Sequence, residues 1–163
     1  MGNYNPVYRS LWSNQRFSGL KPDEKLVFLY LLTNEKTQQT GIYQILLKQI
    51  ACDCNLDLSP VADAVQSLID KSLITYWENE SLIYIHKFFK FAKGMIKKPA
   101  TLDATIRRQR ELINNPDAWK MFDTEYTEEL KSINKALMNN QANKDNSKDK
   151  NSSSSNNHNI KEE

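Results

Sequence analysis

Residues 47–70, LKQIACDCNLDLSPVADAVQSLID, constrain the fold more than any other stretch of this sequence. Their apolar side chains recur at helical spacing in two groups, separated by the connection Asn55–Leu58. The groups are Leu47, Ile50, Ala51 and Cys54, then Val61, Ala64, Val65, Leu68 and Ile69. Ser59 is a favourable N-cap for the second group, and Pro60 is a favourable first helical residue. Two helices joined by so short a connection predict a helix-turn-helix unit.

Two further segments flank this unit. KPDEKLVFLYLLTN, residues 21–34, predicts a core helix that begins at Pro22, with acidic side chains in its first turn. SLITYW (72–77) and SLIYIHKFF (81–89) are rich in β-branched and aromatic residues and are joined by the polar turn ENE, which predicts a β-hairpin. Three helices closed by a two-stranded hairpin describe an α+β, mostly helical, winged helix-turn-helix domain, which we assign to residues 4–92.

The remaining chain divides into an extension and a tail. Residues 93–138 are interpreted as a basic connector and a helical extension, with one helix capped by Thr101 and another that starts at Asn115 and Pro116. The second helix carries an apolar stripe that should pack on the winged domain or on a second copy of the chain. Its members are Trp119, Phe122, Tyr126, Ile133 and Leu137. Residues 139–163 are almost entirely Asn, Ser, Lys and Asp, which predicts a disordered polar tail.

Positive charge is concentrated in one segment, although the formal net charge of the whole chain is only +2. The basic side chains of this segment are Lys87, Lys90, Lys93, Lys97, Lys98, Arg107, Arg108 and Arg110. Such a density is typical of a surface that binds a polyanion, so we interpret the segment as the anchor for DNA. The alternative is a solvated helical face on which Arg107 and Arg108 pair with Glu111.

The second helix of the helix-turn-helix unit is the expected reader of base edges. The candidate contacts are Ser59, Gln66, Ser67 and Lys71. The same helix and the hairpin tip also carry acidic side chains, which are Asp63, Asp70, Glu78 and Glu80. Because carboxylates repel phosphates, we expect affinity to come mainly from the basic segment, while the helix contributes orientation or modest readout.

Other classes of function find little support in the sequence. The two cysteines, Cys52 and Cys54, have C-x-C spacing without a second ligand pair, so we expect no metal site. Phosphate-binding glycine loops are absent, and we expect neither a cofactor nor an enzymatic activity. The longest apolar run, LVFLYLL, is far shorter than the roughly 20 residues of a spanning helix. No signal pattern opens the chain, so we expect a cytoplasmic location, which for a phage-encoded protein is the host bacterial cytoplasm.

SLWSNQRFSGLKPDEKLVFLYLLTN together with TGIYQILLKQIACDCNLDLSPVADAVQSLIDKSLI resembles the N-terminal winged-helix domain of phage replication proteins, the replisome organisers related to the bacterial primosomal DnaD family. IHKFFKF and KKPATLDATIRRQRELINNPDAWKMFDTEY resemble the segment that follows in those proteins, so the resemblance covers roughly residues 4–130. It implies binding of double- or single-stranded DNA, self-association, and recruitment of a helicase or helicase loader. Lys21 stands where a serine-like cap is usual, Ser72 stands where a glycine is usual, and no second DnaD-type domain is recognisable.

Two rival functions remain open at this point. The first is a transcriptional regulator of the winged-helix type, which also binds DNA. The second is a protein-interaction module, such as a phage inhibitor of a host complex, for which the acidic helix and hairpin would form the contact surface. A winged helix alone does not decide among them, since the fold serves both DNA and protein binding.

Overall fold

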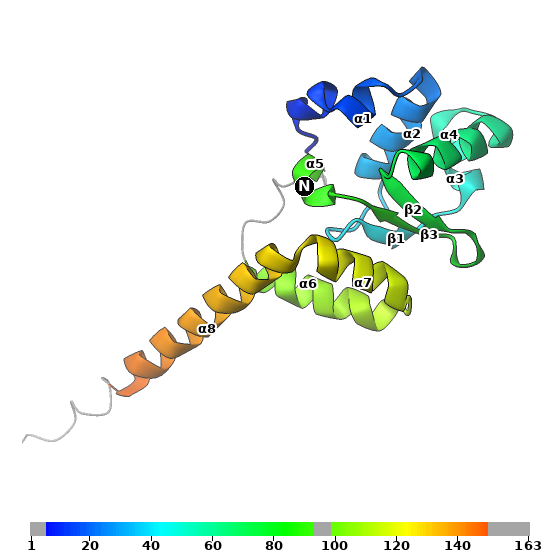
Figure 1. Ribbon diagram of the computed structural model, residues 1–163. Helices are drawn as coiled ribbons and strands as arrows, with labels where there is room; N and C mark the ends of the chain where they lie inside the picture. The colour runs from blue at the N-terminus through cyan, green and yellow to red at the C-terminus, as the bar shows by residue number, and fades with distance from the viewer. Residues whose placement is uncertain (1–5, 93–98, 150–163) are drawn as a thin grey trace, which may run out of the picture. The chain divides into compact units, whose positions relative to one another are not determined.

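The computed structural model describes residues 6–92 and 99–149, and its fold is α+β and mostly helical (Figure 1). The chain divides into two compact units, residues 1–125 and residues 126–163. The first unit holds every strand of the described chain and the helices α1 to α7. The second unit holds the helix α8.

Helix α2, Pro22–Thr33, is the central helix of the first unit. It begins at Pro22 as expected, and the backbone N–H of Lys21 donates to the Glu24 carboxylate at 2.9 Å. This bond satisfies a group that has no partner within the helix, so a side chain three residues later stabilises the start of α2. Val27, Phe28 and Leu31 are fully buried and form the middle of the core.

Helices α3, Leu47–Cys54, and α4, Leu58–Asp70, are joined by a short turn. Asn55 occupies the left-handed region with φ 52°, a conformation that Asn tolerates better than most residues. The predicted start of α4 was two residues late, because Leu58 is its first residue and Asp57 precedes it as N-cap. Pro60 therefore lies within the first turn, where its missing N–H has no intrahelical partner to lose. The apolar face of α4 packs on α2 and α3.

The sheet has three antiparallel strands, whereas the sequence predicted the hairpin and, after Gly41, only a short extended piece. Strands β2, Ile74–Trp77, and β3, Leu82–Ile85, form that hairpin around a short 3-10 turn, Glu78–Glu80. The additional strand β1, Ile42–Gln44, precedes α3 and pairs with the other edge of β3. Every residue of β3 is buried, so both faces of this central strand are covered. In Figure 1 helices α2 to α4 lie on one side of the sheet and α6 and α7 on the other.

Three short helices lie before α2 and after β3 in the sequence. These are the 3-10 helix η1, Arg9–Ser13, and the α-helices α1, Gln15–Ser18, and α5, Phe88–Ala92. Asn14 caps α1, since its side-chain oxygen accepts from the N–H groups of Arg16 and Phe17. The N–H of Tyr8 donates to the carbonyl of Phe91 at 3.1 Å, which ties the start of the described chain to α5.

Helices α6, Pro99–Leu112, and α7, Pro116–Glu125, belong to the first unit. They lie against the sheet, where Gln109 of α6 accepts from the Thr40 hydroxyl just before β1 and Asn115 donates to Glu80 of the hairpin. Helix α6 begins two residues before the predicted cap at Thr101. Asn115 does cap α7, because its side-chain oxygen accepts from the N–H of Ala118 at 2.8 Å. The ring of Phe122 contacts that of Phe89 with centroids 6.0 Å apart. The sequence predicted that the apolar stripe packs either on the preceding domain or on a second copy of the chain. Phe122 packs on the preceding domain.

The second unit departs from the sequence prediction in two ways. The predicted helix from Pro116 is interrupted, since α7 ends at Glu125 and α8 runs over Thr127–Asp149. Helix α8 also continues well past Asn139, into the segment predicted to be a disordered tail. No proline or glycine occurs between Pro116 and Asp149, and each further helical residue adds one backbone hydrogen bond without a new nucleation step. Residues 150–163 lie outside the described residues.

Candidate nucleic-acid interface

The basic side chains predicted to anchor DNA separate into distinct groups. Lys93, Lys97 and Lys98 lie outside the described residues. Arg107 forms an ion pair with Asp103 at 2.9 Å on the same helix. Glu111 had been the expected partner of Arg107 in the alternative interpretation, and Asp103 takes its place.

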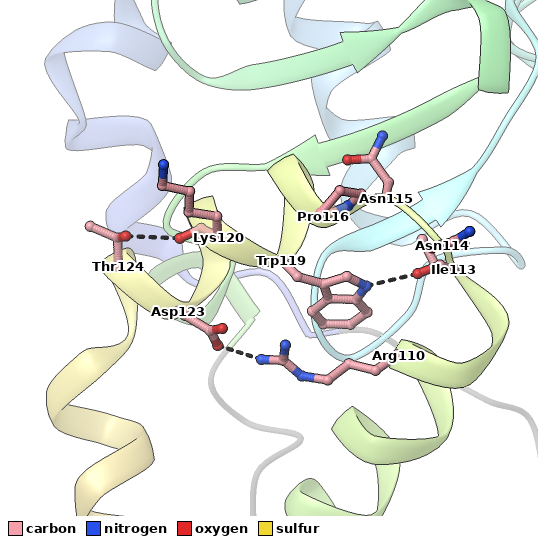
Figure 2. Close-up of a pocket in the computed structure, with 9 residues that line it drawn as sticks. All are labelled: Arg110, Ile113, Asn114, Asn115, Pro116, Trp119, Lys120, Asp123 and Thr124. Atoms are coloured by element: carbon pink, nitrogen blue, oxygen red, sulfur yellow. Dashed lines mark hydrogen bonds and ion pairs between the residues drawn. The ribbon is translucent and has the colours of Figure 1, made fainter.

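Arg110 is held by two interactions within the extension. Its guanidinium forms an ion pair with Asp123 on α7 and lies over the ring of Trp119 at 4.7 Å from the centroid. The indole N–H of Trp119 in turn donates to the carbonyl of Ile113 at 2.9 Å. Figure 2 shows these side chains around an open hollow of about 510 Å³. Arg110 therefore stabilises the contact between α6 and α7.

Lys87 and Lys90 have a different environment. Both are exposed, and neither forms an ion pair with any residue that the structure describes. Arg108 is also exposed without such a pair, but it lines a separate hollow beside Lys36. Lys87 and Lys90 belong to one turn, because the Lys90 N–H donates to the Lys87 carbonyl at 2.8 Å.

Arg16 joins these lysines from a distant part of the sequence. Its Nη1 donates to the carbonyl of Ser72, directly after α4, at 3.3 Å. Arg16, Ser72 and Lys87 line one hollow of about 220 Å³. We call Arg16, Lys87 and Lys90 the cationic surface. Arg16 was missed from the sequence, where nothing near it signals its proximity to residues 72–87.

Buried aromatic side chains position the lysines of the cationic surface. Phe88 and Phe91 are nearly completely buried, so Lys87 and Lys90 project outward from the same short segment. Gly41 accommodates this anchor, because a Cβ on Gly41 would lie 2.8 Å from the Cβ of Phe88. Gly41 also has φ +72°, which other residues rarely adopt.

Helix α4 presents only part of its predicted contact set to solvent. Ser59 and Gln66 are exposed, and the Gln66 amide donates to the Asp70 carboxylate at 2.9 Å. Asp63 is exposed on the same helix. The open face of α4 is therefore polar to acidic, and among the described residues it carries no lysine or arginine between Ser59 and Asp70.

Ser67 and Lys71 are occupied by a contact with the start of α2. The Lys71 ammonium donates to the Ser67 hydroxyl at 2.5 Å and lies 3.6 Å from the buried Glu24 carboxylate. Burial acts to raise the pKa of Glu24, but bonds from the Lys21 N–H and Ser67, with the charge of Lys71, hold the pKa below its usual value. These two predicted DNA contacts therefore have a structural role in joining α4 to α2.

One glutamate of the hairpin tip is hydrogen-bonded to the helical extension. The amide of Asn115 donates to both oxygens of the Glu80 carboxylate, at 3.0 and 3.1 Å. Glu80 is thereby bound to the N-terminus of α7, and both Glu78 and Glu80 stay exposed. Asn115, which caps α7 and holds the hairpin, was recognised from the sequence only as a helix start.

The cysteines occupy positions with no ligand set around them. Cys52 is exposed and Cys54 is half-buried, and burial together with the charge of Asp53 raises the pKa of the Cys54 thiol. Within residues 6–92 and 99–149, no group of three His, Cys, Asp or Glu side chains is arranged to hold a metal ion.

None of the helices in the described part of the chain combines the length and apolar character needed to cross a bilayer. The chain matches no protein-family model, no curated protein and no solved structure.

Proposed function

We propose that residues 4–92 form a winged helix-turn-helix domain and that the chain is a DNA-binding replication protein of the phage replisome-organiser type. The left-handed turn at Asn55 and the antiparallel hairpin directly after α4 support this assignment. The observation that carries the DNA-binding part is the cationic surface. Arg16 and Lys87 line one hollow with Ser72, just after α4, and Lys90 follows in the same turn as Lys87. The side chains of these three residues form no ion pair with any residue that the structure describes.

The cationic surface and α4 would have different tasks. Exposed cations gain most from phosphate contact, because they release counterions without first breaking an ion pair. Helix α4 offers Ser59 and Gln66 as hydrogen-bonding groups but has acidic neighbours. Affinity therefore comes from the cationic surface and from the lysines that follow it in the sequence, while α4 supplies orientation or limited readout.

A salt titration tests this proposal. The wild-type protein should bind double- or single-stranded DNA at low salt, with an affinity that falls as salt is added. Replacing both Lys87 and Lys90 with alanine should weaken binding to all sequences alike and reduce the slope of log K against log salt by roughly 1.4 to 1.8. Lys48→Ala is the matched control, since Lys48 is exposed on α3 and does not line the hollow that holds Arg16 and Lys87. Equal effects of the double variant and the control would refute the assignment.

Assembly with other replication factors forms the second part of the proposal. A helicase or helicase loader is the proposed partner, and self-association of the chain is proposed as well. Sedimentation of the protein alone and with a loader would test both, and a monomer that binds no loader would contradict them. A transcriptional regulator would instead bind one operator sequence far more tightly than other DNA.

One observation favours a protein-interaction module as the second candidate. The open face of α4 carries Asp63 and Asp70, and the hairpin tip carries the exposed Glu78 and Glu80. Such a surface suits a basic partner protein better than a phosphate backbone. Absence of DNA binding at low salt would move this candidate ahead of the first.

A further inference from the structure

Glu125, the last residue of α7, contacts the end of the hairpin with both carboxylate oxygens. One oxygen accepts the backbone N–H of Lys87, and the other lies 3.3 Å from Nδ1 of His86. The opposite nitrogen of the His86 ring is 2.9 Å from the hydroxyl of Thr75 on β2. A single side chain of the extension is therefore linked to both strands of the hairpin and to the turn that opens α5.

The turn at Lys87 needs such a partner. Lys87 has φ 55°, a left-handed conformation that is unfavourable for a residue with a side chain. The strand pairing of β3 ends before it, at Ile85, so the Lys87 N–H has no partner in the sheet. The Lys87 carbonyl accepts from Lys90 and starts α5. The Glu125 carboxylate thus fixes the backbone of Lys87, and this backbone determines the directions in which the Lys87 and Lys90 side chains project.

We infer that Glu125 is a positioning residue for DNA binding. Its carboxylate fixes the Lys87 turn so that Lys87 and Lys90 project from the cationic surface toward phosphate, although it carries a charge that DNA repels. This inference rests on the proposed DNA-binding function. It also makes the helical extension part of the binding site, because α7 orders a surface that it does not itself form.

The sign of one substitution separates this role from simple electrostatics. Removing an acidic side chain near a DNA-binding surface ordinarily strengthens binding, because a repulsive charge is lost. Glu125→Ala should do the opposite and weaken binding by roughly 3- to 10-fold, the equivalent of one ordinary hydrogen bond. Glu125→Gln should bind at least as well as the wild type, because its amide oxygen can still accept the Lys87 N–H while the charge is gone.

Asp117→Ala provides the matched control. Asp117 lies on the same helix, is exposed, and lines the same hollow as Glu125. Its removal should leave affinity unchanged or raise it. A second measurement, the hydrogen exchange of the Lys87 amide, should show faster exchange in Glu125→Ala and near wild-type protection in Glu125→Gln. Thermal unfolding of each variant would show whether a weak binder is still folded.

Each outcome has a separate meaning. Suppose that the wild-type protein binds DNA and that Glu125→Ala binds it as tightly as Asp117→Ala does. This result would overturn the inference about Glu125 and leave the proposed function intact. Unchanged exchange at the Lys87 amide in Glu125→Ala would overturn it as well, and this readout serves even if that variant is less stable. Absence of DNA binding by the wild-type protein would overturn the proposed function and this inference with it.

Discussion

One basic stretch of the sequence supplies Lys87 and Lys90, at the start of α5, as well as Arg107 and Arg110 on α6, yet the fold gives the two pairs different environments. Arg107 and Arg110 pair with carboxylates of the extension, and Arg110 also stacks on Trp119. Lys87 and Lys90 project from a segment whose aromatic side chains are buried, and their ammonium groups form no ion pair with any residue that the structure describes. Charge density in a sequence therefore locates a basic region, while the pairing of each charge decides whether it is available to a partner.

Gly41→Ala should have the largest effect, because it removes the support of the lysine-bearing segment. The new Cβ would meet the Phe88 side chain at 2.8 Å and would force a left-handed backbone on alanine. We expect a loss of about 2–4 kcal/mol in the free energy of unfolding, measured by urea denaturation, together with weaker DNA binding. Gly19→Ala is the control, since its nearest atom is 3.5 Å away and its φ is −78°. A similar loss in both variants would contradict this explanation.

Arg110→Ala and Lys90→Ala should separate the two basic groups directly. Loss of the Arg110 stack on Trp119 and of its pair with Asp123 should cost about 1 kcal/mol of stability and change DNA affinity little. Lys90→Ala should weaken DNA binding and leave the unfolding midpoint nearly unchanged. Urea denaturation and a salt-dependent binding assay on both variants would check this pair of results. If both variants lost DNA affinity equally, ion pairing within the extension would not determine which basic side chains are available to DNA.

Ser72→Gly should raise the stability of the protein and leave the cationic surface, which lies next to Ser72, unchanged. Ser72 has φ 52°, and its backbone carbonyl, which a substitution retains, accepts the hydrogen bond from Arg16. Glycine adopts this conformation without a Cβ penalty, so the free energy of unfolding should rise by about 0.5–1 kcal/mol. DNA affinity should stay at the wild-type value. A destabilised variant would show that the serine side chain contributes more than its conformation costs.

Glu24→Gln should produce the smallest effect, visible mainly as a change in pH dependence. The pKa of Glu24 is lowered in the folded state, so its contribution to stability is present above about pH 4.5 and is lost as the pH falls through the folded-state pKa. Wild-type stability should therefore decline in acid more steeply than that of Glu24→Gln. Urea denaturation at a series of pH values would measure the difference, and parallel curves would rule out this contribution.

Local signals in the sequence predicted most of the first unit. Helical spacing and Pro22 located α2, and the same spacing located α3 and α4. The β-branched runs located the hairpin, but the short strand β1 has too few residues to show a period, and its pairing with β3 depends on tertiary contacts. The length of α8 was missed because the polar composition after residue 138 predicted that this segment has no apolar core to pack on and is therefore disordered. A helix that has already formed can continue through such a segment, since each further residue adds a backbone hydrogen bond.

The candidate interface was predictable only in part. Lys87 and Lys90 were found by charge density, and Gln66 and Ser59 by their place on α4. The occupation of Lys71 by Glu24 was not predictable, since it joins two helices distant in sequence. Arg16 and Glu125 were missed for the same reason: each reaches the site across the fold, and neither stands in a motif.

The pairing of β1 with β3 also has a consequence for the order of folding. Ile42 pairs with Tyr84, and the intervening chain comprises α3, α4 and β2. Closing so long a loop costs chain entropy that only later contacts repay, whereas the hairpin and the helix pair form from neighbouring residues. We therefore expect α3, α4 and the hairpin to be substantially formed in the folding transition state and β1 to dock afterwards. Substitutions at Ile42 should then accelerate unfolding more than they slow folding.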